Sequence, residues 1–376
     1  MQKAIQEEKQ PPFSQAELNA VLRAHEHFVA NRGGQRALLS GKTLDSLNLA
    51  NRNLVEADIS GASLVRANMF GSNLARASLY CADLRGCNLH SANLSGADMR
   101  GASFKGAKLA YATLDRADLR AAMMMYIRPD RTSILNRGSL TSDGNGIPGG
   151  VDFSNCSMKC VSFGNARLNG VNFSGAVLSG ATFTGAKLVN ASFRGAVLTG
   201  VNLKDLGVSA DALNDCVLDI SATAMAKAGE LRARLDAHRE WIASSGKQGA
   251  SAVLDGEDLR PLQEDIAGKS LIGLSARNVV AIGVNFSGCQ LQGAKFDGAD
   301  LRDANFSDAD LSGASLKSAK LAQAQFDKTN LRTLHLLNGD TVAPDLTEAE
   351  AIEQQFQRAH LDKHVSALGL PIAMVV

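Results

Sequence analysis

The sequence is poor in the residues that most proteins use for large cores and reactive sites. It has one Trp, three Tyr and seven Pro in 376 residues, and its six Cys include no Cys-x-x-Cys pair. No disulfide framework or zinc site of the usual spacing is therefore indicated. We also expect no membrane span and no Sec-type signal, because no long apolar run exists and the chain starts polar. A reducing cytoplasm is the expected location, and export by a non-Sec secretion system stays compatible with it.

The sequence also lacks an excess of charge of either sign. Lys and Arg number 39 and Asp and Glu number 38, which gives a formal net charge of +1. A protein dedicated to nucleic acid would gather basic residues on one face and add exposed aromatic side chains for base stacking. Neither feature is present in the sequence, so we do not expect a nucleic-acid partner.

What the chain has instead is a period of five residues. Seventeen successive positions five apart, from Leu44 to Met124, carry only Leu, Ile, Met or Phe. We call these apolar positions centres. Neither an α-helix nor a β-strand repeats every five residues. A short, strict period is typical of a solenoid, in which each unit buries its apolar residue by stacking on its neighbours.

A small residue stands two positions before each of the last fourteen centres of this array. It is Ala in every case except for Ser72 and Cys87. Units such as Ala92-Asn93-Leu94-Ser95-Gly96 and Ala299-Asp300-Leu301-Arg302 resemble the pentapeptide-repeat family. The resemblance implies an all-β solenoid, a right-handed quadrilateral β-helix whose coils stack about 4.8 Å apart. One large and one small inward residue on each side suit such a coil.

A second array has centres every five residues from Phe153 to Leu203. Phe returns every ten residues in it, which predicts stacked Phe ladders inside the column. The 29 residues between Met124 and Phe153 are not a multiple of five, and they contain Pro and Gly in turn-forming patterns. We interpret residues 126–150 as an insertion or a broken coil. Whether the first two arrays form one continuous column stays open at this point.

A third array runs from Phe286 to Leu336, and its register extends backwards to Ile266 as a degraded first coil. Four of the six Cys stand at the small position or at its continuation and are interpreted as small core residues: Cys87, Cys156, Cys216 and Cys289. Across the three arrays, the residues chosen to represent the structural core are Leu84, Leu94, Phe104, Phe163, Phe173, Phe183, Leu301 and Phe306.

Three helices are predicted around the arrays. Ser14-Gln15-Ala16-Glu17 is a capping box that opens the first helix, which Gly33-Gly34 ends. Residues 223–244 form a second helix, and Thr347-Glu348-Ala349-Glu350 opens a third that runs to about Leu368. These helices are expected to cap the open ends of the columns, where unpaired backbone would otherwise invite aggregation.

The first two helices belong to an internal duplication. Residues 22–30 align with residues 235–243, so that His25 matches His238 and Phe28 matches Trp241. Each helix is thus interpreted as the lid of the array that follows it, with these four residues in the lids. The two His are ligand or acid–base candidates, but we favour hydrogen bonding to the backbone of the first coil, which seals the lid.

The expected organisation follows from these elements. It comprises an N-terminal cap (1–40), a first solenoid (41–218), a linker and cap helix (219–250), a second solenoid (251–340) and a C-terminal helix and tail (341–376).

Other polar groups are weaker candidates. Asp143-Gly144-Asn145-Gly146 faintly resembles a calcium loop but lacks the later acidic ligands. His360 and His364 are four residues apart on the third predicted helix, with no third zinc ligand nearby. The Asp and Asn residues before the centres are interpreted as solvated outward positions. We therefore predict no catalytic, cofactor-binding or metal-binding residue and no cofactor.

The sequence favours a non-enzymatic scaffold that presents rigid β-helix faces to a protein partner, with the terminal helix or the apolar tail Pro371–Val376 available for docking or self-association. Three alternatives stay open. The first is an effector or adaptor associated with a bacterial secretion system. The second is a mimic of DNA that protects gyrase, as in one branch of the family, although the outward positions mix basic and acidic residues. The third is an enzyme with its site in residues 126–150 or 205–222.

Overall fold

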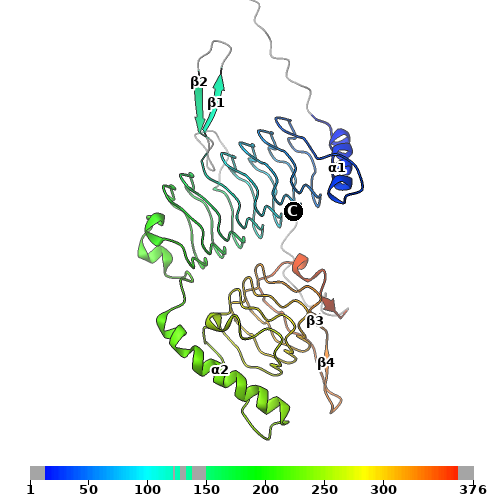
Figure 1. Cartoon of the computed structure of the whole chain (residues 1–376), viewed down its shortest axis with the longest axis vertical. Helices are drawn as coiled ribbons and strands as arrows, with labels where there is room; N and C mark the ends of the chain where they lie inside the picture. Colours follow the sequence, from blue (N-terminus) through cyan, green and yellow to red (C-terminus); the bar gives the residue numbers. More distant parts are fainter. Residues whose placement is uncertain (1–12, 122, 128–132, 138–149, 363–376) are drawn as a thin grey trace, which may run out of the picture. The chain divides into compact units, whose positions relative to one another are not determined.

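The computed structural model describes residues 13–121, 123–127, 133–137 and 150–362 of the chain. The chain divides into two compact units, Met1–Leu218 and Asp219–Val376 (Figure 1). The first unit contains the helix α1 (Gln15–Val29) and a column of stacked coils, which we call column 1. The second contains the helix α2 (Ala222–Ala243) and column 2.

The coils are joined by parallel β-bridges between residues that are twenty positions apart. Ser63 is bridged to Asp83, and Asp83 is bridged to Ser103. Each bridge rests on two backbone hydrogen bonds: the N–H of Leu64 donates to the carbonyl of Asp83 at 2.8 Å, and the N–H of Asp83 donates to that of Ala62 at 2.9 Å. Such bridges recur every five residues, so the chain folds as a β-helix with one bridge for each pentapeptide.

The five-residue pattern places both inward positions of each unit in the core. The centre Leu84 is 0% exposed and the small residue Ala82 is 1% exposed. Where Cys or Thr replaces Ala, its side chain donates to a backbone carbonyl of the preceding coil, as Cys87 Sγ does to Leu64 at 2.7 Å and Thr329 Oγ1 does to Phe306 at 2.7 Å. A polar atom at the small position is therefore paired with a backbone carbonyl, which belongs to the preceding coil or, for Ser72, to Met69 three residues earlier.

The predicted Phe ladders are confirmed. In column 1, the rings of Phe153 and Phe173 stack with centroids 5.6 Å apart, and those of Phe163 and Phe183 stack at 4.8 Å. Rings ten residues apart in the chain meet edge to face, as Phe173 and Phe183 do at 6.0 Å. Column 2 has its own ladder, in which four rings stack in order: Phe286, Phe306, Phe326 and Phe356.

The first two arrays form one continuous column. The N–H of Leu114 donates to Ser157 at 2.7 Å, and the N–H of Ser157 donates to Ala112 at 3.0 Å, across the interruption in the repeat. Between them the chain forms the antiparallel strands β1 (Met123–Ile127) and β2 (Ser133–Arg137). The interruption is thus an excursion that leaves the ladder of column 1 intact, while Asp143–Gly146 lies outside the described residues.

Column 1 ends one unit earlier than the repeat pattern predicts. Leu203 was expected to be a centre, but it lies in the 3-10 helix η1 (Leu203–Leu206) and is 37% exposed. A second short helix, η2 (Ala210–Leu213), follows before Val217 pairs with Val197. The prediction for Leu203 is wrong because no later coil covers that side.

Column 2 begins before the degraded coil that the sequence suggests. Val253 is already bridged to Ser275 and Asp258 to Val280. The spacing is 22 residues here because the 3-10 helix η3 (Arg260–Leu262) lengthens the first coil.

The predicted C-terminal helix is wrong over the residues that the structure describes. Glu350 pairs with Lys320, and the ring of Phe356 stacks on Phe326 with centroids 4.6 Å apart. The strand β6 (His360–Leu361) pairs in parallel with β3 (Asn330–Leu331), and only the short helix η4 (Glu353–Phe356) is helical. Residues 345–361 are therefore the last coil of column 2. His360 lies on a strand, and His364 and the tail Pro371–Val376 lie outside the described residues.

Leu336 is not a centre either. It is 41% exposed and belongs to an antiparallel hairpin made by β4 (Leu334–His335) and β5 (Thr341–Val342). This hairpin leaves the column after β3, and the coil resumes at Asp345.

The helix α1 closes the first coil of column 1 through a buried His. The Ser14 capping box is present, with the Glu17 N–H donating to Ser14 Oγ and the Ser14 N–H donating to Glu17. His25 is fully buried, and its Nδ1 accepts the N–H of Ala37 at 3.0 Å. The backbone returns from the helix through Gly34, whose φ is +89°.

The helix α2 closes column 2 in the same way. His238 is fully buried, and its Nδ1 accepts the N–H of Ala252 at 3.0 Å. A Cβ at either Gly34 or its counterpart Gly249 would lie 2.1 Å from a helix carbonyl oxygen, so both returns require glycine. The duplication in the sequence thus corresponds to two lids with the same hydrogen bonds.

The aromatic partners of the lid His lie at the periphery. Phe28 stacks on His25 with ring centroids 6.0 Å apart and is 41% exposed. Trp241 stacks on His238 at 5.8 Å and is half-buried. These rings cover the imidazoles from the solvent side and fill none of the column.

Removal of the excursion should preserve column 1. Deleting residues 125–148 places Phe153 five residues after Met124 and Gly150 at the corner between them, so the register of the repeat is restored. Denaturant unfolding of this variant, followed by circular dichroism, should keep the cooperativity of the native chain. Loss of the folded signal would show that the excursion is part of the column.

Acid should destabilise both lids. Burial lowers the pKa of His25 and of His238 in the folded state, so the unfolded chain, whose His titrates near 6.5, binds more protons at lower pH. Stability should therefore be complete above about pH 6.5 and fall as the pH drops below it. The variant His25→Asn/His238→Asn keeps an acceptor for the two N–H groups but cannot titrate, and its unfolding free energy should depend less on pH. Equal dependence in both proteins would assign the acid sensitivity to other groups.

Candidate interaction surface

The outward face of each pentapeptide begins with a polar residue that holds the backbone. The Oδ1 of Asn68 accepts the N–H of Phe70 at 3.2 Å, and the Oδ1 of Asn93 accepts that of Ser95 at 3.1 Å. Asp310 does the same for Ser312 at 3.0 Å. The recurrent Asp and Asn are therefore turn-forming residues, and their regular, equivalent surroundings do not separate a catalytic acid from a base.

Many of the outward carboxylates are paired with an Arg two residues later. The distances are 2.6 Å for Asp83–Arg85, 2.7 Å for Asp98–Arg100 and 2.6 Å for Asp118–Arg120. The hydrogen bond from Arg100 lowers the pKa of Asp98. Column 2 repeats the pairing in Asp258–Arg260 and in Asp300–Arg302, although the second of these pairs is buried.

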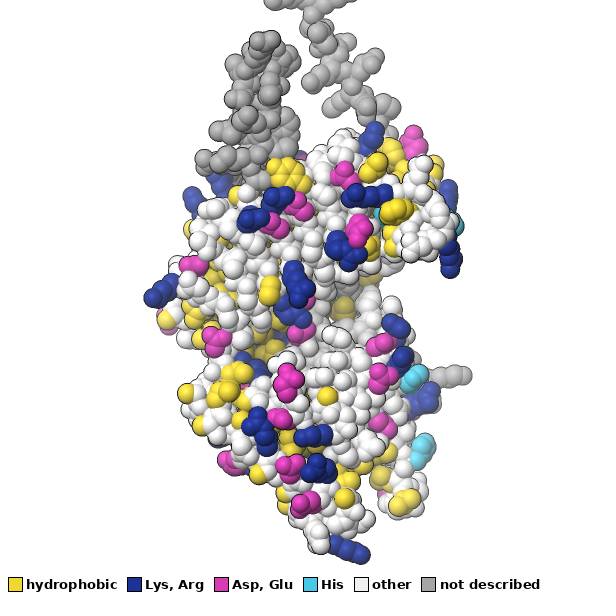
Figure 2. Space-filling view, in the orientation of Figure 1, with side chains coloured by type: hydrophobic (Ala, Val, Ile, Leu, Met, Phe, Trp, Pro, Cys, Tyr) yellow, Lys and Arg dark blue, Asp and Glu magenta, His cyan; other side chains and the backbone are white. Residues whose placement is uncertain are grey.

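This pairing spreads both signs of charge over the surface. Figure 2 shows Lys and Arg side chains interspersed with Asp and Glu on the visible face of each unit. A surface that attracts a polyanion, or imitates one, needs charges of one sign in register. The paired side chains provide neither a positive surface for a polyanion nor a negative surface that imitates one.

One side of column 1 carries a row of aromatic side chains. Phe70 and His90 follow centres twenty residues apart, and their rings stack with centroids 5.6 Å apart. Tyr111 continues the row, 5.6 Å from His90. All three are half-buried, and burial lowers the pKa of His90, which favours the neutral imidazole. We call Phe70, His90 and Tyr111 the aromatic row.

The aromatic row lies beside amide side chains on the same side of the column. Asn48, Asn68 and Asn88 are bridged in turn, and the Nδ2 of Asn88 donates to the Oδ1 of Asn68 at 3.3 Å. Partly exposed aromatic rings next to amides are the composition that protein interfaces favour. This row is not among the predictions from the sequence, although the twenty-residue spacing of Phe70 and His90 is a signal for it.

A second exposed aromatic lies on a different side of column 1. Tyr80 follows the centre Leu79, and the guanidinium of Arg100 lies 5.4 Å from its ring centroid. Its ring is thus covered by a cation that is already paired with Asp98. Tyr80 is a useful reference position, because it is outward and aromatic but outside the row.

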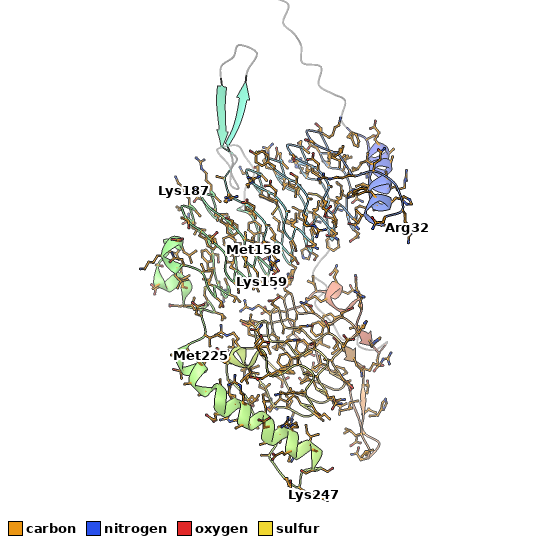
Figure 3. The ribbon with its side chains drawn as sticks, viewed as in Figure 1. Arg32, Met158, Lys159, Lys187, Met225 and Lys247 are labelled. Carbon is orange, nitrogen blue, oxygen red and sulfur yellow. The ribbon has the colours of Figure 1, made fainter. Side chains whose placement is uncertain are left out.

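The residues chosen from the sequence to represent the core are all buried. None is more than 1% exposed, so none can meet a ligand, and the set comprises Leu84, Leu94, Phe104, Phe163, Phe173, Phe183, Leu301 and Phe306. Figure 3 shows the same contrast at labelled positions, with Met158 among the coils and Lys187 extending away from them.

The cysteines offer no reactive centre in the core. Cys87, Cys156 and Cys289 are buried, and burial raises the pKa of the Cys87 thiol to about 12. Cys216 is less buried and donates to the carbonyl of Phe193 at 3.0 Å. Because burial raises their pKa, the thiols of Cys87, Cys156 and Cys289 stay protonated at neutral pH and are weak nucleophiles.

Within residues 205–222, the side chain of Asp205 is held by two polar neighbours. Asp205 accepts Thr184 Oγ1 at 2.9 Å and Asn202 Nδ2 at 3.1 Å. Among the described residues, no three His, Cys, Asp or Glu side chains are placed to hold a metal ion. A search of the same residues found no helix with the length and apolarity needed to cross a membrane.

Solved structures with similar coils share little sequence with this chain. QnrB1, a plasmid-mediated fluoroquinolone resistance protein, is 20% identical with a TM-score of 0.25, and the match covers 53% of this chain and 93% of QnrB1. Rfr23 from the cyanobacterium Cyanothece 51142 is 18% identical with a TM-score of 0.25, over 54% of this chain and 99% of Rfr23. A pentapeptide repeat protein of the Arabidopsis thaliana thylakoid lumen is 19% identical with a TM-score of 0.20, over 44% and 70%.

The match to family models is more extensive. Pentapeptide repeats in eight copies match residues 53–90, 87–122, 149–175 and 176–206, and a pentapeptide repeat region matches residues 283–362. A search of curated proteins found no match. The family models together cover more than half of the chain, which therefore belongs to the pentapeptide-repeat family.

Proposed function

We propose that this protein is a non-enzymatic scaffold that binds a protein partner through the aromatic row of column 1. In this proposal each column is a right-handed quadrilateral β-helix with four sides per coil. Bridges between residues twenty apart, repeated every five residues, support the four-sided form. The observation that carries the function is the partly exposed row formed by Phe70, His90 and Tyr111.

Rigid display is the mechanism. The residue before each of the first two aromatic positions is a buried centre, Met69 or Leu89, whose N–H is held by the next coil at 2.7 and 2.8 Å. The row is therefore fixed before a partner arrives, and binding has to order few side chains. Large aromatic side chains that lose little rotamer freedom supply much of the energy of protein interfaces.

The charge pattern supports a protein partner over nucleic acid or a DNA-binding enzyme. Arg85, Arg100 and Arg120 are each engaged by an Asp within 2.7 Å. These three Arg are already engaged by carboxylates, so the pairs themselves offer neither a free cation for phosphates nor an unpaired anion. Aromatic and amide contacts remain as the means of recognition, and these suit another protein surface.

The test is affinity capture of the tagged full chain from the cells that express it, followed by mass spectrometry. A single protein should be recovered with the native chain and lost by about tenfold or more with the variant Phe70→Ser/His90→Ser/Tyr111→Ser. The control variant Tyr80→Ala, which changes an outward aromatic outside the row, should retain it. Both variants should keep the native unfolding midpoint within error.

Two outcomes would contradict the proposal. Recovery of the chain alone would contradict the binding of a protein partner. Equal recovery of the partner by the triple variant and by Tyr80→Ala would remove the aromatic row as the binding site.

A further inference from the structure

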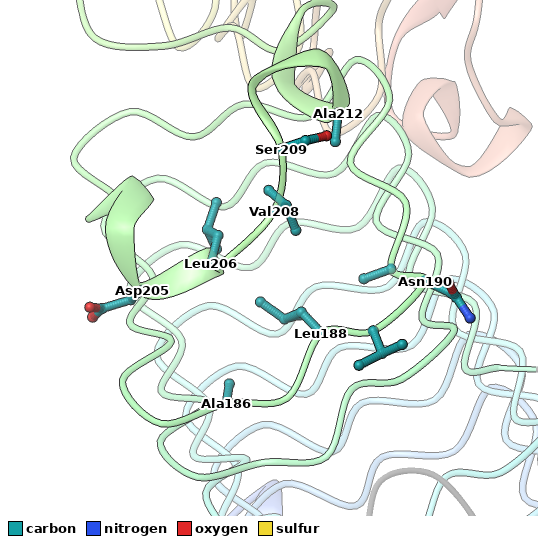
Figure 4. A pocket seen from close by; sticks show the side chains of 11 residues that line it. Ala186, Leu188, Asn190, Asp205, Leu206, Val208, Ser209 and Ala212 are labelled. Atoms are coloured by element: carbon teal, nitrogen blue, oxygen red, sulfur yellow. The ribbon is translucent and has the colours of Figure 1, made fainter.

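A groove lies at the end of column 1, between its last coil and the short helices that follow. Its volume is about 430 Å³, within the usual range for ligand sites. Leu188 and Ala186 line one wall, and Leu206, Val208 and Ala212 line the other (Figure 4). Figure 4 shows Leu188, Leu206 and Val208 arranged around the same hollow.

The backbone along one wall of the groove is an open edge. On this side, the N–H of Leu168 donates to Lys187 at 2.7 Å and the N–H of Lys187 donates to Ala166 at 2.9 Å. The next coil would repeat both bonds, with a carbonyl accepting from Leu188 and an N–H donating to Ala186. Among the residues that the structure describes, none makes either bond, and none accepts from the N–H of Asn190.

The chain itself turns away from this edge. The residue twenty positions after Lys187 is Gly207, which ends η1 with φ +59° and does not pair. Ten residues further along the chain the ladder continues, because the N–H of Leu198 donates to Val217 and the N–H of Val217 donates to Ala196, at 2.8 and 2.9 Å. One side of the last coil is therefore covered, while the side at Leu188 keeps its strand edge.

We propose that this groove binds an extended peptide segment of a partner protein by parallel β-strand addition to residues 186–190. The inference rests on the proposed scaffold role and deepens it by giving a second contact and the chemistry of its ligand. Unpaired donors two residues apart, at Leu188 and Asn190, match the period of a strand. Main-chain pairing would supply affinity, and side-chain positions would supply selectivity.

The register of the column specifies the peptide. A residue that pairs with Lys187 points outward, as Lys187 does. The following residue lies over Leu188 and is large and apolar, whereas the preceding residue lies over Ala186 and is small. The expected motif is therefore small, any residue, large apolar, which is the order found in the chain's own repeats.

Charge has little part in this recognition. Asp205 is the only charged residue that lines the groove, and its carboxylate already accepts bonds from Thr184 and Asn202. Binding should therefore change little between low and high salt, in contrast to an interface based on exposed ion pairs.

The test uses the full chain and a fluorescent synthetic peptide with the sequence of residues 91–97, Ser-Ala-Asn-Leu-Ser-Gly-Ala. Anisotropy titration should give saturable binding below about 1 mM. A methyl group on the backbone nitrogen of the peptide's Asn removes the donor to Ala186 and should weaken binding about tenfold or more. The same methyl on the Leu nitrogen, which faces away from the edge, should have little effect.

Matched protein variants locate the site. Ala212 and Ala210 are both exposed on η2, but only Ala212 lines the groove. Ala212→Trp should weaken peptide binding about tenfold or more, and Ala210→Trp should leave it unchanged. Both substitutions add the same bulk at an exposed site, so a difference between them reports on the groove.

The proposal is overturned if no peptide binding is detected up to about 1 mM, or if both methylated peptides bind equally. Self-association of the chain that Ala212→Trp abolishes would assign the groove to a second copy and also overturn it. These outcomes are independent of the capture experiment on the aromatic row, which lies on a different coil, so either site can fail alone.

Discussion

Within the columns that the structure describes, a buried centre depends on a neighbouring coil, most often on a residue twenty positions away in the chain. A centre such as Leu84 is covered only because the next coil places Phe104 over it and pairs with its backbone. The small inward position follows from the same constraint, since two large side chains on one side would overfill the coil. So do the ends, where no further coil exists. There the protein uses the helices α1 and α2 with their buried His, or it leaves an edge open.

The same constraint explains how the chain tolerates interruptions. The excursion with β1 and β2, the hairpin of β4 and β5 and the expansion at η3 all leave the column and return with the ladder in register. The entropy cost of closing such an insertion grows only slowly with its length, so the column accepts insertions of different lengths. The outward positions accept more kinds of residue, because the only contact required there is an Asp or Asn oxygen that accepts the backbone N–H two residues later. Arg pairs and aromatic rings can then be placed on chosen coils, which is where recognition can arise.

Much of this architecture is predictable from the sequence because a period of five has few physical explanations. The columns, the Phe ladders and the duplicated helices follow from residue spacing alone. The last coil was missed although Leu346, Ala351, Phe356 and Leu361 keep the phase of the third array. A capping-box pattern at Thr347–Glu350 favoured a helix there, and pairing with Lys320 and β3 decided otherwise.

Two further predictions were wrong because a residue that fits the period lacks a neighbouring coil. Leu203 and Leu336 fit the period but lack a covering coil, so they lie on the surface. The aromatic row and the groove do not follow from the five-residue repeat of apolar centres. They depend on which outward residues meet across coils and on where the ladder stops.

Amide hydrogen exchange on the full chain, resolved by residue, tests this account most directly. Leu168 and Leu188 are centres on the same side of neighbouring coils, and only the first has a carbonyl to receive its N–H. The account predicts that the amide of Leu168 exchanges about a thousandfold or more slower than an unprotected amide, while those of Leu188 and Asn190 exchange freely. Equal, strong protection of Leu168 and Leu188 would show that the edge is closed and would contradict the account of how column 1 ends.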